Sequence, residues 1–236
     1  MKQQKSLKKM SGGLMGALAI AGGSSAYASV IVVTPPPNVN VPPGTATFSE
    51  DWDVNSDGIM DFTINYRFPN TSTGSGVIWQ ANLNPFAGTA ATNGVVGYSG
   101  PFIRYAFAFS GGTAINAGSP FSTSTQVCLG SRYLSGGVPN FYGGFAAGPT
   151  VGNGGNGVTP GTFAFAGFRF QAADGIHFGW INLAVDAGTI NFTNAAFESS
   201  AGTPINTGAI PEPSTLAMLA LGAAGVLGTA IKRRLA

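Results

Sequence analysis

The chain has few of the residues that build disulfides and soft-metal sites. Among its 236 residues there is one cysteine, Cys128, and one histidine, His177. A single cysteine excludes an intramolecular disulfide and a cysteine-based zinc site, and a single histidine excludes a cluster of histidine ligands. We expect Cys128 to behave as a small buried apolar residue, and His177, which stands in an apolar strand-like run, to be structural. Apolar packing, with or without a hard cation, must therefore hold the fold together.

Charge is also scarce, and the positive charge is concentrated at the two ends. Only 8% of the residues are charged. Between Ser29 and Ile210 there is no lysine, and four arginines stand against eight acidic residues, which leaves this stretch with a net charge of −4. No basic patch is available to neutralise phosphates, so we expect no nucleic-acid partner.

Residues 1–28 have the three parts of a secretory signal peptide. A lysine-rich segment, 1–10, precedes a short apolar segment, 13–23, and small side chains follow at Ala26 and Ala28. Signal peptidase accepts small side chains at these two positions, so cleavage after Ala28 is predicted. The alternative is a membrane anchor, but the apolar segment is too short and too rich in glycine to span ~30 Å of hydrocarbon.

A second three-part segment, 211–236, ends the chain. Its first part is the motif Pro211, Glu212, Pro213, Ser214 and Thr215. The two prolines favour an extended backbone, and Ser214 or Thr215 can cap a helix over the sixteen uncharged residues 216–231. Such a transmembrane helix reaches only ~24 Å and would anchor weakly, because a bilayer core is ~30 Å thick. The basic residues after it should stay in the cytoplasm, which places the preceding domain outside.

This tail resembles the PEP-CTERM sorting signal of bacteria that make exopolysaccharide. The resemblance rests on the Pro-Glu-Pro motif, the Gly/Ala/Leu-rich run and the basic end. It implies that a membrane-embedded exosortase cuts near the motif, after which the domain reaches the cell surface or extracellular matrix. The implied partners are signal peptidase, exosortase, exopolysaccharide and, before processing, the inner membrane. A permanent tail anchor is the alternative interpretation.

The stretch between the two ends has the pattern of a β-protein. Residues 29–44 contain two proline clusters, which predict an extended, solvated lead-in to a domain over 45–210. Apolar and polar residues alternate over 62–68 and 103–109, and 176–185 is apolar on both faces, as in a central strand. No helical periodicity is present there. We predict an all-β fold, a single antiparallel, jelly-roll-like β-sandwich.

The most specific motif inside this domain is an acidic loop over 53–61. The predicted calcium ligands are Asp53, Asn55, Asp57, the Ile59 carbonyl and Asp61. Oxygen ligands at alternate positions can converge on a hard cation, and Gly58 permits the sharp turn between them. An EF-hand helix pair is not expected, because its twelfth position is Ile64 in a strand pattern. The loop resembles the calcium loops of extracellular β-proteins, in which an upstream acid, here Glu50 or Asp51, can complete the shell.

A simple hairpin turn at Asp57-Gly58 is the alternative reading of this loop, with the acids solvated. Five of the nine carboxylates in the chain lie between residues 50 and 61. A turn alone does not explain that concentration, so we favour calcium.

Catalytic patterns are weak. No Gly-x-Ser-x-Gly motif accompanies the single histidine. Asp174, Asp186 and Glu198 remain as carboxylates for a glycosidase pair, but nothing around them separates an acid from a base. We expect a non-enzymatic surface or matrix protein that associates with exopolysaccharide or the cell envelope. A secreted carbohydrate-active hydrolase is the alternative.

Three tryptophans could serve either the core or a sugar-binding surface. They are Trp52, Trp79 and Trp180. Tryptophan rings stack on sugars when exposed, but each of these stands in a strand-like apolar context, so we expect burial in the core.

Overall fold

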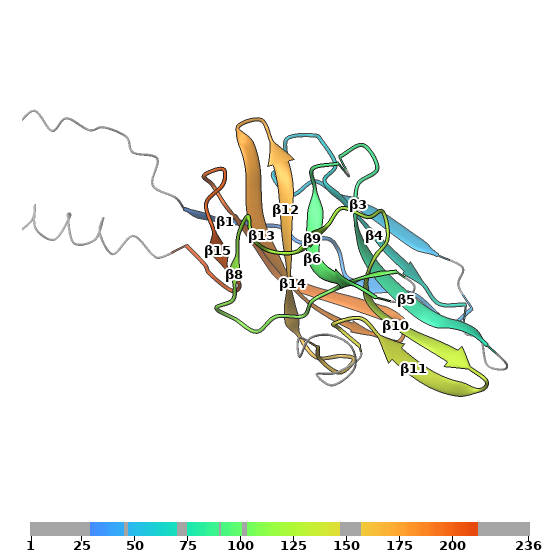
Figure 1. Cartoon of the computed structure of the whole chain (residues 1–236). Coiled ribbons are helices and arrows are strands. Elements are labelled where there is room, and N and C mark those ends of the chain that lie inside the picture. Colours follow the sequence, from blue (N-terminus) through green and yellow to red (C-terminus); the bar gives the residue numbers. More distant parts are fainter. Residues whose placement is uncertain are drawn as a thin grey trace, which may run out of the picture.

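The computed structural model describes residues 29–44, 47–69, 75–89, 91–100, 103–146 and 157–211 (Figure 1). All of the regular elements in these ranges are strands, which confirms the predicted all-β class. The strands are β1 (Val30–Val33), β2 (Val39–Asn40), β3 (Phe48–Trp52), β4 (Phe62–Arg67), β5 (Gly76–Pro85), β6 (Gly94–Ser99), β7 (Arg104–Ala106), β8 (Ala114–Ile115), β9 (Phe121–Ser122), β10 (Val127–Ser135), β11 (Val138–Tyr142), β12 (Ala164–Ala172), β13 (Gly175–Asp186), β14 (Thr189–Glu198) and β15 (Ile205–Asn206).

Thirteen of these strands form one large sheet. Its order is β1-β14-β13-β12-β6-β7-β10-β5-β4-β3, with β11 on β10, β2 on β14 and β9 on β6, while β15 and β8 form a separate pair. All of these pairings are antiparallel except that of β7 with β10. The prediction of a purely antiparallel sheet is therefore wrong at this point. A parallel pair needs a long crossover connection, and the chain between Ala106 and Val127 supplies it.

The sheet bends at β6, and this bend brings its two halves face to face. Gly94 and Val95 pair with β12, whereas Gly97 to Ser99 pair with β7. A Cβ atom at Gly97 would clash with the carbonyl of Tyr105, so the close approach at the bend requires glycine. One strand thus belongs to both halves, as at the corners of packed sheets.

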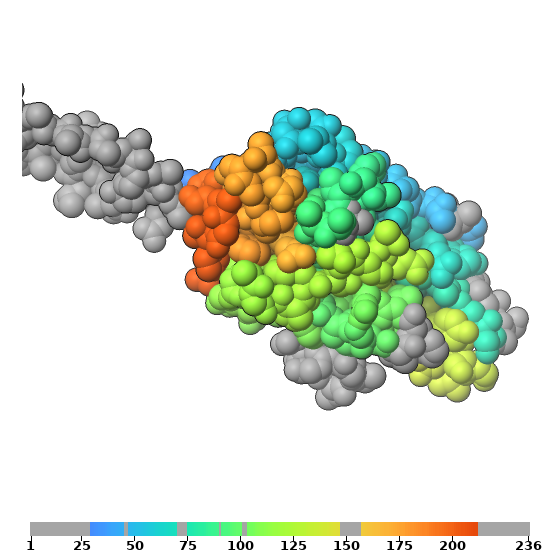
Figure 2. Space-filling model, turned by 45° about the horizontal axis from the view of Figure 1, so that its top comes forward, coloured from blue at the N-terminus to red at the C-terminus, as the bar shows by residue number. Residues whose placement is uncertain are grey.

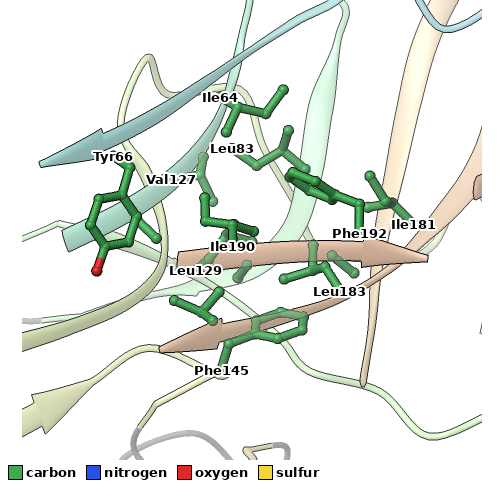
Figure 3. Packing of buried hydrophobic residues seen from close by; sticks show 14 of the residues in the cluster. Ile64, Tyr66, Leu83, Val127, Leu129, Phe145, Ile181, Leu183, Ile190 and Phe192 are labelled. Atoms are coloured by element: carbon green, nitrogen blue, oxygen red, sulfur yellow. The ribbon is translucent and has the colours of Figure 1, made fainter. Parts of the chain in front are cut away.

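The core fills the space between the two halves. Phe168 on β12 contacts the rings of Trp52 and Phe62 across this space, with centroids 5.5 Å and 5.3 Å apart. The Tyr66 hydroxyl on β4 donates to the Asp186 carbonyl at 2.8 Å and accepts from the Gly188 N–H at 2.6 Å. Figure 3 shows apolar side chains of β4, β5 and β10 directed toward those of β13 and β14. This burial supplies most of the stabilisation in a chain without disulfides.

Two segments differ from the sequence prediction. Residues 29–44 are not a solvated lead-in, because β1 and β2 pair with β14, and Val39 and Val41 are buried. The proline cluster merely separates the two short strands. The predicted strand 103–109 is shortened to β7, because Phe107 bonds to Val96 while Phe109 bridges to Phe165 on β12. The segment 103–109 pairs first with β6 and then with β12 instead of with one strand.

Both ends of the described chain lie at the same end of the domain. β1 and β15 lie together there, while the β10–β11 hairpin lies at the opposite end (Figures 1 and 2). The predicted signal peptide, 1–28, and sorting helix, 216–231, are outside the described residues. Within the ranges that the structure describes, no helix is long and apolar enough to cross a membrane.

Candidate functional site

The acidic loop connects β3 to β4 and is organised by its own side chains. Asp53 accepts hydrogen bonds from the Gly58 N–H at 2.7 Å and the Asp57 N–H at 3.3 Å. Asp57 accepts from the Ile59 N–H at 2.8 Å, and the Asn55 amide donates to Asp57 at 2.9 Å. The turn uses left-handed backbone at two positions, with φ of 60° at Ser56 and 88° at Gly58. The loop therefore gathers Asp53, Asn55 and Asp57 on one exposed turn.

Asp61 has a different position, beneath the loop. It is buried, and its two carboxylate oxygens accept from the Val54 N–H at 3.0 Å and the Asn93 amide at 3.1 Å. Burial raises the pKa of Asp61 to about 6, and the charges of Asp53 and Asp57 add to the increase, while its two hydrogen bonds oppose it. Asp61 thus anchors the closed loop to the domain.

Asn93 completes this anchor and was not anticipated from the sequence. It is fully buried, and its amide also donates to the Asp61 carbonyl at 3.1 Å. Its side-chain oxygen accepts from the Gln171 N–H at 2.8 Å, which links the acidic loop to β12. An isolated asparagine before a glycine reads as a turn residue in the sequence, so no local pattern indicates this role.

The loop offers some, but not all, of the oxygen ligands that a hard cation needs. Two carboxylates and an amide oxygen are hard ligands of the kind that calcium takes. Among the residues that the structure describes, no group of three or more His, Cys, Asp or Glu side chains is close enough to hold a metal ion. A cation here would therefore depend on Asn55 and on backbone carbonyl oxygen as well as on Asp53 and Asp57.

The three carboxylates considered for a glycosidase pair, Asp174, Asp186 and Glu198, do not all lie together. Asp174 precedes the first residue of β13 and Asp186 is its last, so the extended strand holds them roughly 40 Å apart. Asp174 accepts from His177 Nε2 at 2.8 Å, and this hydrogen bond holds the pKa of Asp174 below its usual value. Glu198 is buried, and its backbone carbonyl lies 2.7 Å from His177 Nδ1.

His177 therefore joins two segments rather than facing a substrate. Both of its ring nitrogens lie within hydrogen-bonding distance of oxygen atoms. The ring packs against Phe170 and Phe197, with centroids 5.5 Å and 5.8 Å away. These contacts are those of a structural histidine.

Other buried residues agree with the sequence prediction. Trp52, Trp79 and Trp180 all lie in the core, at 5%, 1% and 0% exposure. Cys128 is buried, and burial raises the pKa of its thiol to about 12, so the thiol stays protonated and unreactive. None of these side chains is available as a sugar-stacking surface.

A polar and aromatic groove on the outer face of the sheet was missed by sequence reasoning. We call it the outer groove and define it by Arg67, Gln80, Arg104, Tyr105, Gln126 and Tyr142. These residues lie on β4, β5, β7 and β11 and in the segment before β10, and no two of them are adjacent in the sequence except Arg104 and Tyr105. Only the folded sheet brings them together.

Comparison with known proteins supports the reading of the tail. A search of curated proteins and a search of solved structures each found no match to the chain. The model of the PEP-CTERM protein-sorting motif matches residues 209–234, which span the Pro-Glu-Pro motif, the uncharged run and the basic residues. This motif implies processing by an exosortase, export, and sorting at the membrane toward the cell surface. The chain thus carries a C-terminal PEP-CTERM sorting motif, as the resemblance predicted.

Proposed function

We propose that this protein is a non-enzymatic component of the cell surface or extracellular matrix, and that its β-domain associates with exopolysaccharide or the cell envelope. The observation that carries the proposal is a sorting motif at 209–234 that follows directly on a folded domain whose last strand, β15, ends at Asn206. Sorting thus delivers a compact β-domain, which we regard as a jelly-roll-like β-sandwich scaffold.

The placement of the carboxylates favours binding over catalysis. A glycosidase requires two carboxyl groups within ~5 to 9.5 Å of each other on either side of a cleft. Asp174 and Asp186 lie at opposite ends of β13, and Asp174 is engaged by His177. Asp174 and Asp186 therefore do not supply the carboxylate pair that the hydrolase alternative requires.

Calcium is proposed as a stabiliser of the domain. Asp53, Asn55, Asp57 and the Ile59 carbonyl would hold the ion, while Asp61 and Asn93 hold the loop in place from below. An ion here would neutralise the repulsion between carboxylates that the loop brings together. The role is structural, since the loop lies on the short connection between two core strands.

The proposal is tested by following the protein in cells that produce it with its own signal and tail. The extracellular polysaccharide is isolated by density-gradient flotation, with and without enzymatic digestion of the glycan. We expect the protein to co-fractionate with intact polysaccharide and to be released by digestion.

A protein that remains in the soluble medium fraction would contradict association with polysaccharide. Release of reducing sugar from purified polysaccharide by the protein would contradict the non-enzymatic role and favour a hydrolase. The matched control is a chain with Glu212→Ala, which disrupts the sorting motif and leaves the domain unchanged.

A further inference from the structure

The outer groove crosses five adjacent strands of the sheet. A hollow of about 340 Å³ is lined by Arg67, Gln80, Tyr105, Gln126 and Tyr142, among others. It shares Gln126 with a hollow of about 220 Å³ over β4 and β5, and it shares Ile103 and Gln126 with a larger open one beside Arg104. The groove therefore runs from β4 over β5, β10 and β7 to β6, across four interstrand spacings or roughly 19 Å.

The floor of the groove is built from polar side chains that are themselves buried. Gln80, Asn82 and Asn84 alternate with core residues along β5 and are 7%, 8% and 6% exposed. Gln80 and Asn82 are joined in a relay, in which Arg67 Nε donates to Gln80 at 3.2 Å and the Gln80 amide donates to Asn82 at 3.0 Å, while Asn84 accepts from the Val127 N–H. Burying an amide side chain costs more free energy than burying an apolar one of similar size. The presence of these amides at the floor of the groove therefore points to a polar ligand.

Tyrosines form one wall of the groove. Tyr105 and Tyr142 line the groove, and the ring of Tyr98, which lines the adjoining hollow beside Arg104, extends their stack. Successive ring centroids are 5.4 Å and 6.4 Å apart, with interplanar angles of 28° and 22°. Burial raises the pKa of Tyr98 to about 12 and raises that of Tyr105 further, so both phenols stay protonated as hydrogen-bond donors. Tyrosine combines an apolar ring with a polar hydroxyl, which suits a ligand that alternates C–H faces and hydroxyl groups.

The charge in the groove is positive, in contrast to the rest of the domain. Arg67 and Arg104 line it, both are exposed, and no Asp or Glu contributes to its walls. The only ion pair among the described residues is that of His177 with Asp174, so neither arginine has a carboxylate partner. Two of the four arginines in a stretch with net charge −4 thus lie in one groove. Unpaired guanidinium groups favour a carboxylate on the ligand.

We propose that the outer groove binds a chain of acidic polysaccharide, whose sugar rings carry carboxylates. The groove is long and open, as a polymer requires, and combines amide donors and acceptors, phenols and two unpaired cations. A peptide strand is disfavoured, because the groove runs across strands whose backbone groups are already paired in the ladder. The inference rests on the proposed association with exopolysaccharide and assigns it to one surface.

The test uses the full chain, with its signal and tail, in affinity electrophoresis through gels that contain polygalacturonate. A calcium chelator is present throughout, so that metal cross-links cannot cause retention. We expect retardation by polygalacturonate, but not by its fully methyl-esterified form or by polyglutamate. The methyl ester has the sugar without the charge, and polyglutamate has the charge without the sugar.

Variants locate the binding surface. Tyr133 on β10 also lines the groove. We expect Arg104→Gln and Tyr133→Ala each to weaken retention by at least about tenfold, as loss of a charge-assisted hydrogen bond or of a ring contact predicts. Arg132→Gln is the matched control, since Arg132 packs on Phe141 and does not line the groove. Arg67→Gln repeats the charge test at the other end of the groove, and thermal unfolding of each variant confirms that it is folded.

Two results would overturn the inference. One is equal retention by polygalacturonate and polyglutamate, and the other is retention that Arg104→Gln, Arg67→Gln and Tyr133→Ala leave unchanged. The proposed function fails separately. If the wild-type protein and the groove variants co-fractionate equally with the cell's own polysaccharide, the function stands and the groove is wrong. If polygalacturonate binds through the groove but the protein does not co-fractionate, the groove stands and the function is wrong.

Discussion

The two faces of β4 and β5 bury different kinds of side chain. On the inner face, Ile64 and Leu83 are completely buried against the opposite half of the sheet (Figure 3), and Phe62 is completely buried against Phe168. On the outer face, Asn82 and Gln80 are nearly as buried, yet they lie in a chain of hydrogen bonds. Burial of the inner face stabilises the fold, because apolar side chains leave water. The hydrogen bonds of the outer face contribute less, because water would hydrogen-bond the same groups in the unfolded chain. The comparison separates a surface that stabilises the fold from one that is shaped for a ligand.

The largest effect should come from the inner face. Leu83→Ala removes buried methyl groups from the centre of the core and should lower the free energy of unfolding by about 2 to 5 kcal/mol. Val77→Ala, a change of similar kind in the half-buried lining of the groove, should cost much less. Urea unfolding measures both. Equal losses would show that the two faces contribute alike.

A smaller effect is expected at the polar floor. Asn84→Ala leaves the buried Val127 N–H without its acceptor, 2.9 Å away, and should cost about 1 to 3 kcal/mol. Asn65→Ala is the control, because Asn65 lies on the same face and its side chain makes no hydrogen bond within the described ranges of the chain. If Asn84→Ala unfolds at the same urea concentration as the wild type, the floor is not held by this contact.

The fold and the site differ in how far the sequence predicts them. Alternation over 62–68 and the apolar run 176–185 predict β4 and β13, because one or both faces of those strands are simply apolar. Gln80, Asn82 and Asn84 alternate with apolar residues in the same way, yet they are buried. Alternation alone does not predict this burial, because it depends on strand order and on residues distant in the sequence, such as Gln126, which lines the same hollow.

The acidic loop and its anchor show the same division. Asp53, Asn55 and Asp57 follow one another at alternate positions, so their gathering on one turn is a local property that the sequence predicts. Asn93 reaches Asp61 from a different connection, and only the closed sheet brings the two together. Contacts of this range depend on strand order, which periodicity does not encode.

Calcium should stabilise the acidic loop by a modest amount. At millimolar calcium, with the affinity of an extracellular site, we expect about 1 kcal/mol, seen as a higher midpoint of thermal unfolding than in chelator. Asp57→Ala should abolish the difference, and Asp186→Ala, the same change of an acid outside the loop, should keep it. A midpoint that calcium does not move would leave the hairpin turn as the correct reading.

The smallest effect concerns the exposed Asp174 and its contact with His177. Because the folded-state pKa of Asp174 lies below its unfolded value of 3.8, its contribution is present above about pH 4 and is lost as the pH falls further. The wild type should therefore exceed Asp174→Asn slightly in stability at pH 5, and the difference should shrink toward pH 3. A difference that grows on acidification would contradict this sign.

The outer groove can bind extracellular polysaccharide only if the domain lies outside the cell, and we expect it to work there after its signal peptide and sorting tail are removed. The intact mass of the protein recovered from the surface or medium of its native cells tests this most directly. We predict a mass that corresponds to a chain from Ser29 to a residue near Pro211, with the signal peptide and the sorting tail both removed. A mass that retains Lys232 to Ala236 would show a permanent anchor and contradict the account.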